Sequence, residues 1–132
     1  MLLEIHQQTP EFRKVEQTVE ILRRNGVLII PTDSVYSFAC ALGSTKGLEK
    51  MARLRDLSPS EANFSIICKD LSQVSEYVAP LPQPVFKLMK RALPGPFTFI
   101  LRAGVKVPRI FRKSKKEVGI RIPDHAIPAA LI

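Results

Sequence analysis

VLIIPTDSVY, residues 27–36, is the stretch that decides how this chain folds. Its first four residues are aliphatic, a run typical of a strand buried on both faces. Pro31 ends that strand, and Thr32, Asp33 and Ser34 follow it at once. In open α/β sheets, ligands bind beyond the carboxyl ends of strands. The stretch therefore predicts either a ligand-binding loop or an ordinary turn, for which Thr, Asp and Ser are equally suited.

Strands and helices are predicted to alternate around this stretch. Upstream, residues 2–5 predict a short first strand, and Thr9 and Pro10 begin a helix that Gly26 ends. Downstream, the apolar pattern predicts a helix capped by Ser44 or Thr45, helices at 71–78 and 85–92, strands at 64–68, 97–101 and 118–122, and a first helical turn at 128–132. This alternation favours an α/β sheet covered on both faces.

Composition limits the classes of protein to consider. The 132 residues fit one domain, and 45% are hydrophobic, which argues against disorder. No apolar run reaches the roughly 20 residues of a membrane helix, and the N-terminus lacks a secretory pattern. Cys40 and Cys68 make no disulfide framework, so we expect a reducing, cytoplasmic setting. The motifs of Rossmann, P-loop, nucleophile-elbow and zinc sites are absent, and no metal ligands are predicted.

Positive charge is concentrated in the last third of the chain. Residues 1–85 hold 9 Lys and Arg against 10 Asp and Glu, whereas residues 86–132 hold 11 against 2. Such asymmetry indicates either a phosphate-bearing partner or a solvated basic face without a specific ligand.

Three further motifs carry polar groups at defined places. Arg53 and Arg55 flank one leucine at the end of a predicted helix, and Asn63 follows near the next strand. Arginine forks suit phosphate oxygens, although a basic helix end is also favourable through the helix dipole alone. The PGP sequence at 94–96 predicts either a rigid turn that fixes Thr98 for binding or only a helix stop before a core strand. Arg121 lies inside an apolar strand, so we expect it to be paired, to face a cleft, or to lie on an exposed strand.

Four blocks in this order and spacing resemble the YrdC/YciO family of threonylcarbamoyl-adenylate synthases and their relatives: PTDSVY, RLR, LPGPFTFIL and GIRIPDH. NFSIICKDLSQVSEY and LPGPFTFIL look most like the YciO branch. The resemblance implies one YrdC-like domain over residues 1–132 without the family's C-terminal Ser-x-Asn block. It also implies the YrdC/RibB-like fold, an α/β twisted open mixed β-sheet flanked by helices, with a positively charged groove on its concave face.

The resemblance also implies a reaction and its partners. L-threonine and bicarbonate give a carbamate that attacks the α-phosphate of ATP, with Mg²⁺, to form threonylcarbamoyl-AMP and pyrophosphate. The product serves the modification of adenosine 37 in tRNA. The alternative is a YciO-like protein that binds nucleotide, tRNA or double-stranded RNA with little synthase activity. In that case Lys113, Lys115 and Lys116 would matter more than Arg121. The oligomeric state is left open.

Site residues follow from matching positions in the family. Ser34 and Arg121 match groups that contact L-threonine, and Arg53, Arg55 and Asn63 match groups on the nucleotide side. The remaining pocket residues are Thr32, Asp33, Tyr36, Cys68 and Thr98. No catalytic residue is assigned, since adenylyl transfer depends on positioning and charge neutralisation.

The chain departs from the family pattern at several of these positions. Ser37 replaces the glycine of Tyr-Gly, Arg53 replaces a lysine, and Cys68 stands where many synthases carry a threonine-binding histidine. Glu117 stands in place of a threonine that touches ATP, and a neighbouring lysine would have to neutralise it. The changes at Cys68 and Glu117 and the missing Ser-x-Asn block favour the binding alternative.

Overall fold

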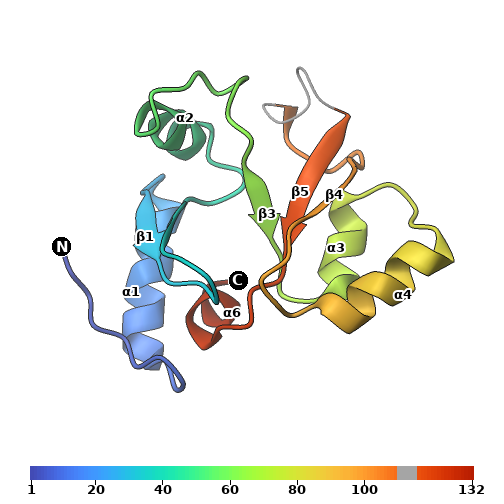
Figure 1. The fold of residues 1–132 in the computed structure, drawn as a ribbon. Coiled ribbons are helices and arrows are strands. Elements are labelled where there is room, and N and C mark those ends of the chain that lie inside the picture. The colour runs from blue at the N-terminus through green and yellow to red at the C-terminus, as the bar shows by residue number, and fades with distance from the viewer. Residues whose placement is uncertain (110–115) are drawn as a thin grey trace.

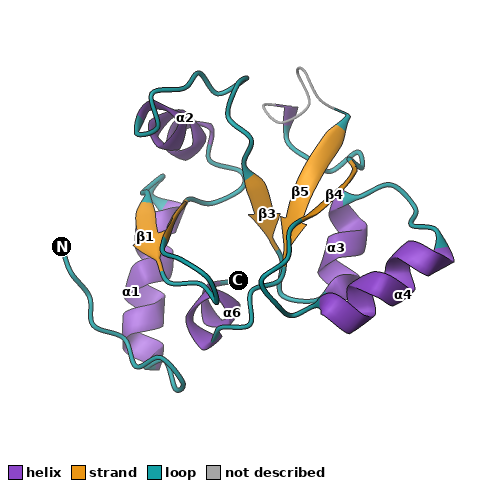
Figure 2. Cartoon of the chain, in the orientation of Figure 1, coloured by secondary structure: helices purple, strands orange, loops and turns teal. Residues whose placement is uncertain are grey.

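The computed structural model describes residues 1–109 and 116–132, in which helices and strands alternate as predicted (Figures 1 and 2). The helices are α1 (Phe12–Arg23), α2 (Thr45–Arg53), α3 (Leu71–Tyr77), α4 (Gln83–Ala92) and α6 (Ala126–Leu131). The strands are β1 (Leu28–Ile30), β2 (Ser37–Ala39), β3 (Ser65–Ile67), β4 (Phe99–Arg102) and β5 (Glu117–Arg121). Lys113 and Lys115 lie outside the described residues.

The described strands form two small sheets. In the three-stranded sheet, β5 lies in the middle, parallel to β3 and antiparallel to β4, so the predicted mixed sheet is confirmed. β1 and β2 form a separate antiparallel pair. Helix α6 contacts α1 beside that pair, while α3 and α4 lie on the far side of the mixed sheet (Figure 1).

Side chains along β5 point alternately into the core and toward the face that carries Arg121. Its Val118 and Ile120 point into the core with Ile122, which follows the strand, whereas Gly119 and Arg121 share the opposite face. The core is built mainly by β3, β5, α3 and α4, with Ile66, Cys68, Val74, Met89, Val118, Ile120 and Ile122 among its buried side chains.

The N-terminal predictions are wrong in two respects. Residues 2–5 form no strand, and α1 is capped by Glu11 rather than Thr9. The Glu11 carboxylate accepts from Lys14 Nζ at 2.7 Å and from the backbone N of His6 at 3.0 Å. These two contacts, that of Lys14 first, lower the pKa of Glu11 to about 2. Thr9 bonds instead to the His6 ring, through its hydroxyl and its backbone N–H, and so belongs to the turn before the helix.

Helix α1 ends at Arg23, and the left-handed residue that terminates it is Asn25 rather than the predicted Gly26. Asn25 takes the left-handed conformation, with a φ of 62°, and the Gly26 N–H donates to the Ile21 carbonyl. Asparagine tolerates this conformation better than most residues. The Asn25 side chain also accepts from the Ser44 hydroxyl at 2.7 Å. Ser44 in turn accepts from the Gly47 N–H, which confirms Ser44 as the cap of α2.

The strand at 27–30 is not buried on both faces. Ile30 is buried, but Ile29 is 65% exposed beside its cross-strand partner Phe38. When a helix covers one face of a two-stranded pair, the other face remains exposed. An apolar run alone does not show whether one face or both faces are covered. Ser65 in β3 is likewise exposed. Among the described residues, no helix has the length and apolar character needed to cross a membrane.

Candidate functional site

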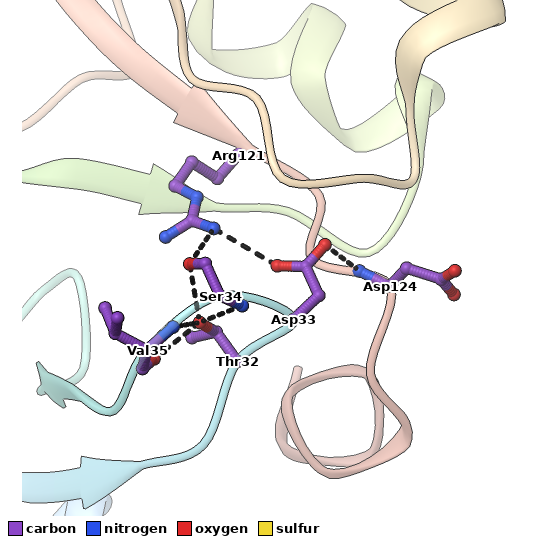
Figure 3. Close-up of polar contacts among 6 residues, drawn as sticks. All are labelled: Thr32, Asp33, Ser34, Val35, Arg121 and Asp124. Atoms are coloured by element: carbon purple, nitrogen blue, oxygen red, sulfur yellow. Dashed lines mark hydrogen bonds and ion pairs between the residues drawn. The ribbon is translucent and has the colours of Figure 1, made fainter.

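The predicted site residues after β1 meet the end of β5. Thr32, Asp33 and Ser34 form the loop between β1 and β2, and Arg121 is the last residue of β5. Figure 3 shows the Arg121 side chain reaching down to this loop. The chain therefore brings together groups that are 87 and 88 positions apart in the sequence.

Arg121 is paired, as expected for a charge inside an apolar strand. Its Nη2 donates to Asp33 Oδ1 and to Ser34 Oγ, both at 3.2 Å. The Arg121 and Asp33 side chains are only 16% and 10% exposed. Within the described part of the chain, the buried Nε of Arg121 has no hydrogen-bond partner. A buried, unpaired donor is costly, so a ligand oxygen that gained access to this atom would be favoured.

Thr32 organises the loop. Its Oγ1 accepts from the backbone N–H groups of Ser34 and Val35 at 3.2 Å and donates to the Val35 carbonyl at 2.6 Å. It also lies 3.2 Å from Ser34 Oγ. A threonine hydroxyl that bonds the backbone ahead of it is typical of a turn. The loop is thus a turn in its local structure, and the turn directs Ser34 toward Arg121.

The predicted nucleotide residues lie outside this network, at the carboxyl end of α2 and beyond it. Arg53 ends α2, and the Arg55 N–H still donates to the Ala52 carbonyl. The chain then turns through Asp56, whose φ is 53°. Arg53, Arg55 and Asn63 are all exposed. The non-helical exit needed to present both guanidinium groups is present, and their role on a nucleotide stays a prediction.

The other predicted pocket residues differ in burial. Tyr36 is 71% exposed before β2, and Thr98 is exposed before β4. Cys68 is buried, its side chain belongs to the core, and its backbone N–H donates to the Arg121 carbonyl at 2.9 Å. Burial raises the pKa of the Cys68 thiol to about 12. In this structure Cys68 supports the end of β5 through its backbone, with its thiol turned into the core.

Sequence reasoning missed the roles of the Asp124 backbone N–H, Gly119 and Ser65 near Arg121. The backbone N–H of Asp124 donates to Asp33 Oδ2 at 2.9 Å. A Cβ at Gly119 would lie 2.7 Å from Ser65 Oγ and 3.3 Å from Thr98 Cγ2, so this face of the sheet is closely packed. A glycine inside a strand, two residues from Arg121 and thus on its face, was the available signal for a close approach.

A cavity of about 330 Å³ lies between the two sheets, and none of the predicted site residues lines it. Its lining is mostly apolar and comes from both sheets and from helices α1, α2 and α6, including Leu22, Leu28, Phe38, Leu48, Ile67 and Leu131. The described residues contain no group of three or more His, Cys, Asp or Glu side chains that could hold a metal ion.

Comparison with known families identifies the class of protein. The family model Sua5_yciO_yrdC, described as "Telomere recombination", matches residues 20–132, so the chain belongs to this family. Over 129 residues it is 39% identical to the uncharacterized protein YciO of Escherichia coli K12, covering 97% of this chain and 62% of that protein. It is 31% identical to the threonylcarbamoyl-AMP synthase of Bacillus subtilis, covering 90% of this chain and 34% of the synthase.

Solved structures agree with the fold. The crystal structure of E. coli YciO matches with a TM-score of 0.87 and 38% identity, covering 96% of this chain and 61% of that one. A structure of P. abyssi Sua5 in complex with L-threonine matches with a TM-score of 0.85 and 22% identity, covering 95% and 36% of the two chains, and shows a shared fold. The chain spans less than two thirds of the length of these relatives. The YrdC-like α/β fold expected from the sequence is confirmed.

Proposed function

We propose that this chain binds L-threonine and ATP and takes part in the formation of threonylcarbamoyl-AMP. The observation that carries the proposal is the pairing of Arg121 with Asp33 and Ser34, which sets a guanidinium beside a hydroxyl. L-threonine offers a carboxylate and a hydroxyl to such a site. Relatives at 28–31% identity are named threonylcarbamoyl-AMP synthases, which supports the choice of substrate.

In this proposal Arg121 receives the carboxylate of L-threonine. Guanidinium groups bind carboxylates through two N–H groups in a plane, and Nε is buried without a partner among the described residues. Ser34 Oγ, already 3.2 Å from Nη2, would lie within reach of the ligand. Low exposure at Arg121 strengthens the attraction, because water competes less for a buried charge.

Arg53 and Arg55 hold the phosphates of ATP in the same proposal. Both guanidinium groups are exposed and so are free to meet a highly charged ligand without first losing a buried contact. Mg²⁺ arrives on the ATP phosphates, since Mg²⁺ keeps several waters and needs few protein ligands.

The proposed reaction has two bond-forming steps. The amine of L-threonine joins the carbon of bicarbonate, and water leaves to give a carbamate. A carbamate oxygen then attacks the α-phosphorus of ATP, the bond to the β-phosphate oxygen breaks, and pyrophosphate leaves. The protein contributes positioning and cations near the phosphates.

Release of pyrophosphate tests the proposal. The wild-type chain should release it from MgATP only when L-threonine and bicarbonate are both present. Arg121→Ala should abolish the release, whereas Arg13→Ala, which removes an exposed arginine from α1, should leave it unchanged. Release that ignores L-threonine, or that survives Arg121→Ala, would contradict the assignment.

A second candidate is binding of nucleotide, tRNA or double-stranded RNA without efficient synthesis. Two observations favour it: identity is higher to YciO than to the named synthases, and Cys68 turns its thiol into the core. RNA retention that falls steeply between low and moderate salt, together with no L-threonine-dependent pyrophosphate, would establish it. Lys113→Ala, Lys115→Ala and Lys116→Ala should then weaken binding more than Arg121→Ala.

A further inference from the structure

Asp33 joins two segments that come from opposite ends of the chain. Its Oδ1 accepts from Arg121 Nη2 at 3.2 Å, and its Oδ2 accepts from the backbone N of Asp124 at 2.9 Å. Figure 3 shows the Asp33 carboxylate lying between these two partners. Asp33 itself follows β1, whereas Arg121 ends β5 and Asp124 lies in the loop between β5 and α6. Each carboxylate oxygen thus has its own partner on the segment that carries the guanidinium.

We propose that Asp33 is the positioning residue of the amino-acid site, holding the Arg121 guanidinium where it receives the substrate carboxylate. The inference rests on the proposed function. Asp33 is negative and would repel a carboxylate, so it acts through Arg121 and does not contact the anion. Asp33 thereby determines how well Arg121 recognises the carboxylate of the proposed substrate.

Burial and geometry make Asp33 suited to this task. An arginine side chain has many rotamers, and a charged partner that is itself fixed reduces them. The Asp33 side chain is 10% exposed, and its second oxygen is held by the rigid backbone at Asp124. The two side-chain contacts of Arg121 in Figure 3 both end on Nη2. The Nε–H therefore stays outside the pairing with Asp33, and a ligand oxygen that reached it would supply the partner it lacks among the described residues.

Asp33→Asn is the informative variant. Asparagine keeps the size of the side chain but has one acceptor oxygen, so it cannot serve both Arg121 and the Asp124 N–H. The matched control is Asp124→Asn, because Asp124 contributes through its backbone and its side chain is exposed and points away from Asp33 (Figure 3). Both variants remove one negative charge from the same region of the protein.

Titration of the whole chain with L-threonine, L-threoninamide and MgATP tests the positioning role of Asp33. L-threoninamide keeps the amine and hydroxyl of L-threonine but replaces the carboxylate with a neutral amide. Asp33→Asn should weaken L-threonine binding at least about tenfold, while affinity for L-threoninamide and for MgATP changes little. Asp124→Asn should leave all three affinities unchanged. A merely structural role for Asp33 would weaken the ligands alike, which would overturn the proposal.

A second measurement observes Arg121 without any ligand. The ¹⁵N NMR signal of the Arg121 Nε–H group, identified by its loss in Arg121→Lys, should exchange faster with water in Asp33→Asn than in the wild type. Unchanged exchange together with unchanged L-threonine affinity would overturn the role of Asp33 alone. If the wild-type chain binds no L-threonine, with or without MgATP, the proposed function is overturned, and the substrate-positioning role falls with it. The exchange rates would then still report whether Asp33 holds Arg121.

Discussion

Replacing Asp33 or Arg121 by alanine should destabilise the fold, and the two losses should not add. Removing one partner of a buried ion pair costs about 3–5 kcal/mol, because the other charge stays in the interior unpaired. Here the side chains keep 10% and 16% exposure, so water partly solvates the orphaned charge. We therefore expect a loss near the low end, about 3 kcal/mol for Asp33→Ala, which also removes the acceptor of the Asp124 N–H.

Arg121→Ala should cost about 2–3 kcal/mol, since the Asp33 carboxylate left behind still accepts from the Asp124 N–H. In the double variant no charge is orphaned. Its total loss should be about 3–4 kcal/mol, which is a coupling of roughly 2 kcal/mol between the two positions. These losses are smaller than the roughly 5–15 kcal/mol typical of a domain, so every variant should remain folded enough to measure.

The measurement is urea unfolding followed by far-ultraviolet circular dichroism, because the chain has no tryptophan for fluorescence. The matched pair is Glu11 with Lys14, an exposed ion pair at 2.7 Å on the surface of α1. Its coupling should be smaller and should fall as salt rises, whereas the buried pair should be little affected. Additivity of Asp33→Ala and Arg121→Ala within about 0.5 kcal/mol would refute the reasoning.

Three further variants or measurements address single positions. Gly119→Ala should destabilise by about 1–2 kcal/mol in urea, because its Cβ would lie 2.7 Å from Ser65 Oγ, and adding Ser65→Ala should recover part of the loss. Asp56→Gly should raise the free energy of unfolding by up to about 1 kcal/mol, since Asp56 has a φ of 53°, and a lower melting temperature would contradict this. Burial raises the pKa values of Cys40 and Cys68 to about 11 and 12, so both thiols stay protonated below those values. Native alkylation at pH 8 should therefore be slow and should accelerate in urea, and rapid labelling of the native chain would count against it.

Local patterns in the sequence predicted most of the elements, and long-range contacts explain the errors. The apolar residues at 118–122 predicted a strand close to β5 and marked Arg121 as an exception within it, because strand patterning is a local property. The burial of Ile29 was overestimated, since exposure depends on whether another layer covers that face. The helix start at Glu11 was missed because the Glu11 side chain binds the backbone N–H of His6 and the Lys14 ammonium and caps no helix N–H, so no capping motif marks it.

The sequence predicted which residues form the site but not the contacts between them. A polar loop after a buried strand indicated Thr32, Asp33 and Ser34, and a charge in an apolar strand indicated Arg121. The contact between Asp33 and Arg121 spans 88 positions and depends on how two sheets pack, which no local pattern contains. The backbone N–H of Asp124 has no sequence signature at all. Arg53, Arg55 and Asn63 stay predictions until nucleotide binding is measured.

Arg121→Lys separates the structural task of this residue from the binding task. A lysine ammonium keeps the positive charge one bond short of Nη2, so it should stay close enough to the Asp33 carboxylate for the ion pair to persist at a longer distance. The change also removes the buried Nε–H that has no partner among the described residues, which offsets some lost packing. Stability should therefore fall by less than about 1 kcal/mol. Lysine has no planar fork, however, so L-threonine affinity should drop at least about tenfold while affinity for MgATP is kept. If Arg121→Lys bound L-threonine as the wild type does, the guanidinium would be a structural tie alone, and the carboxylate site would have to be sought elsewhere.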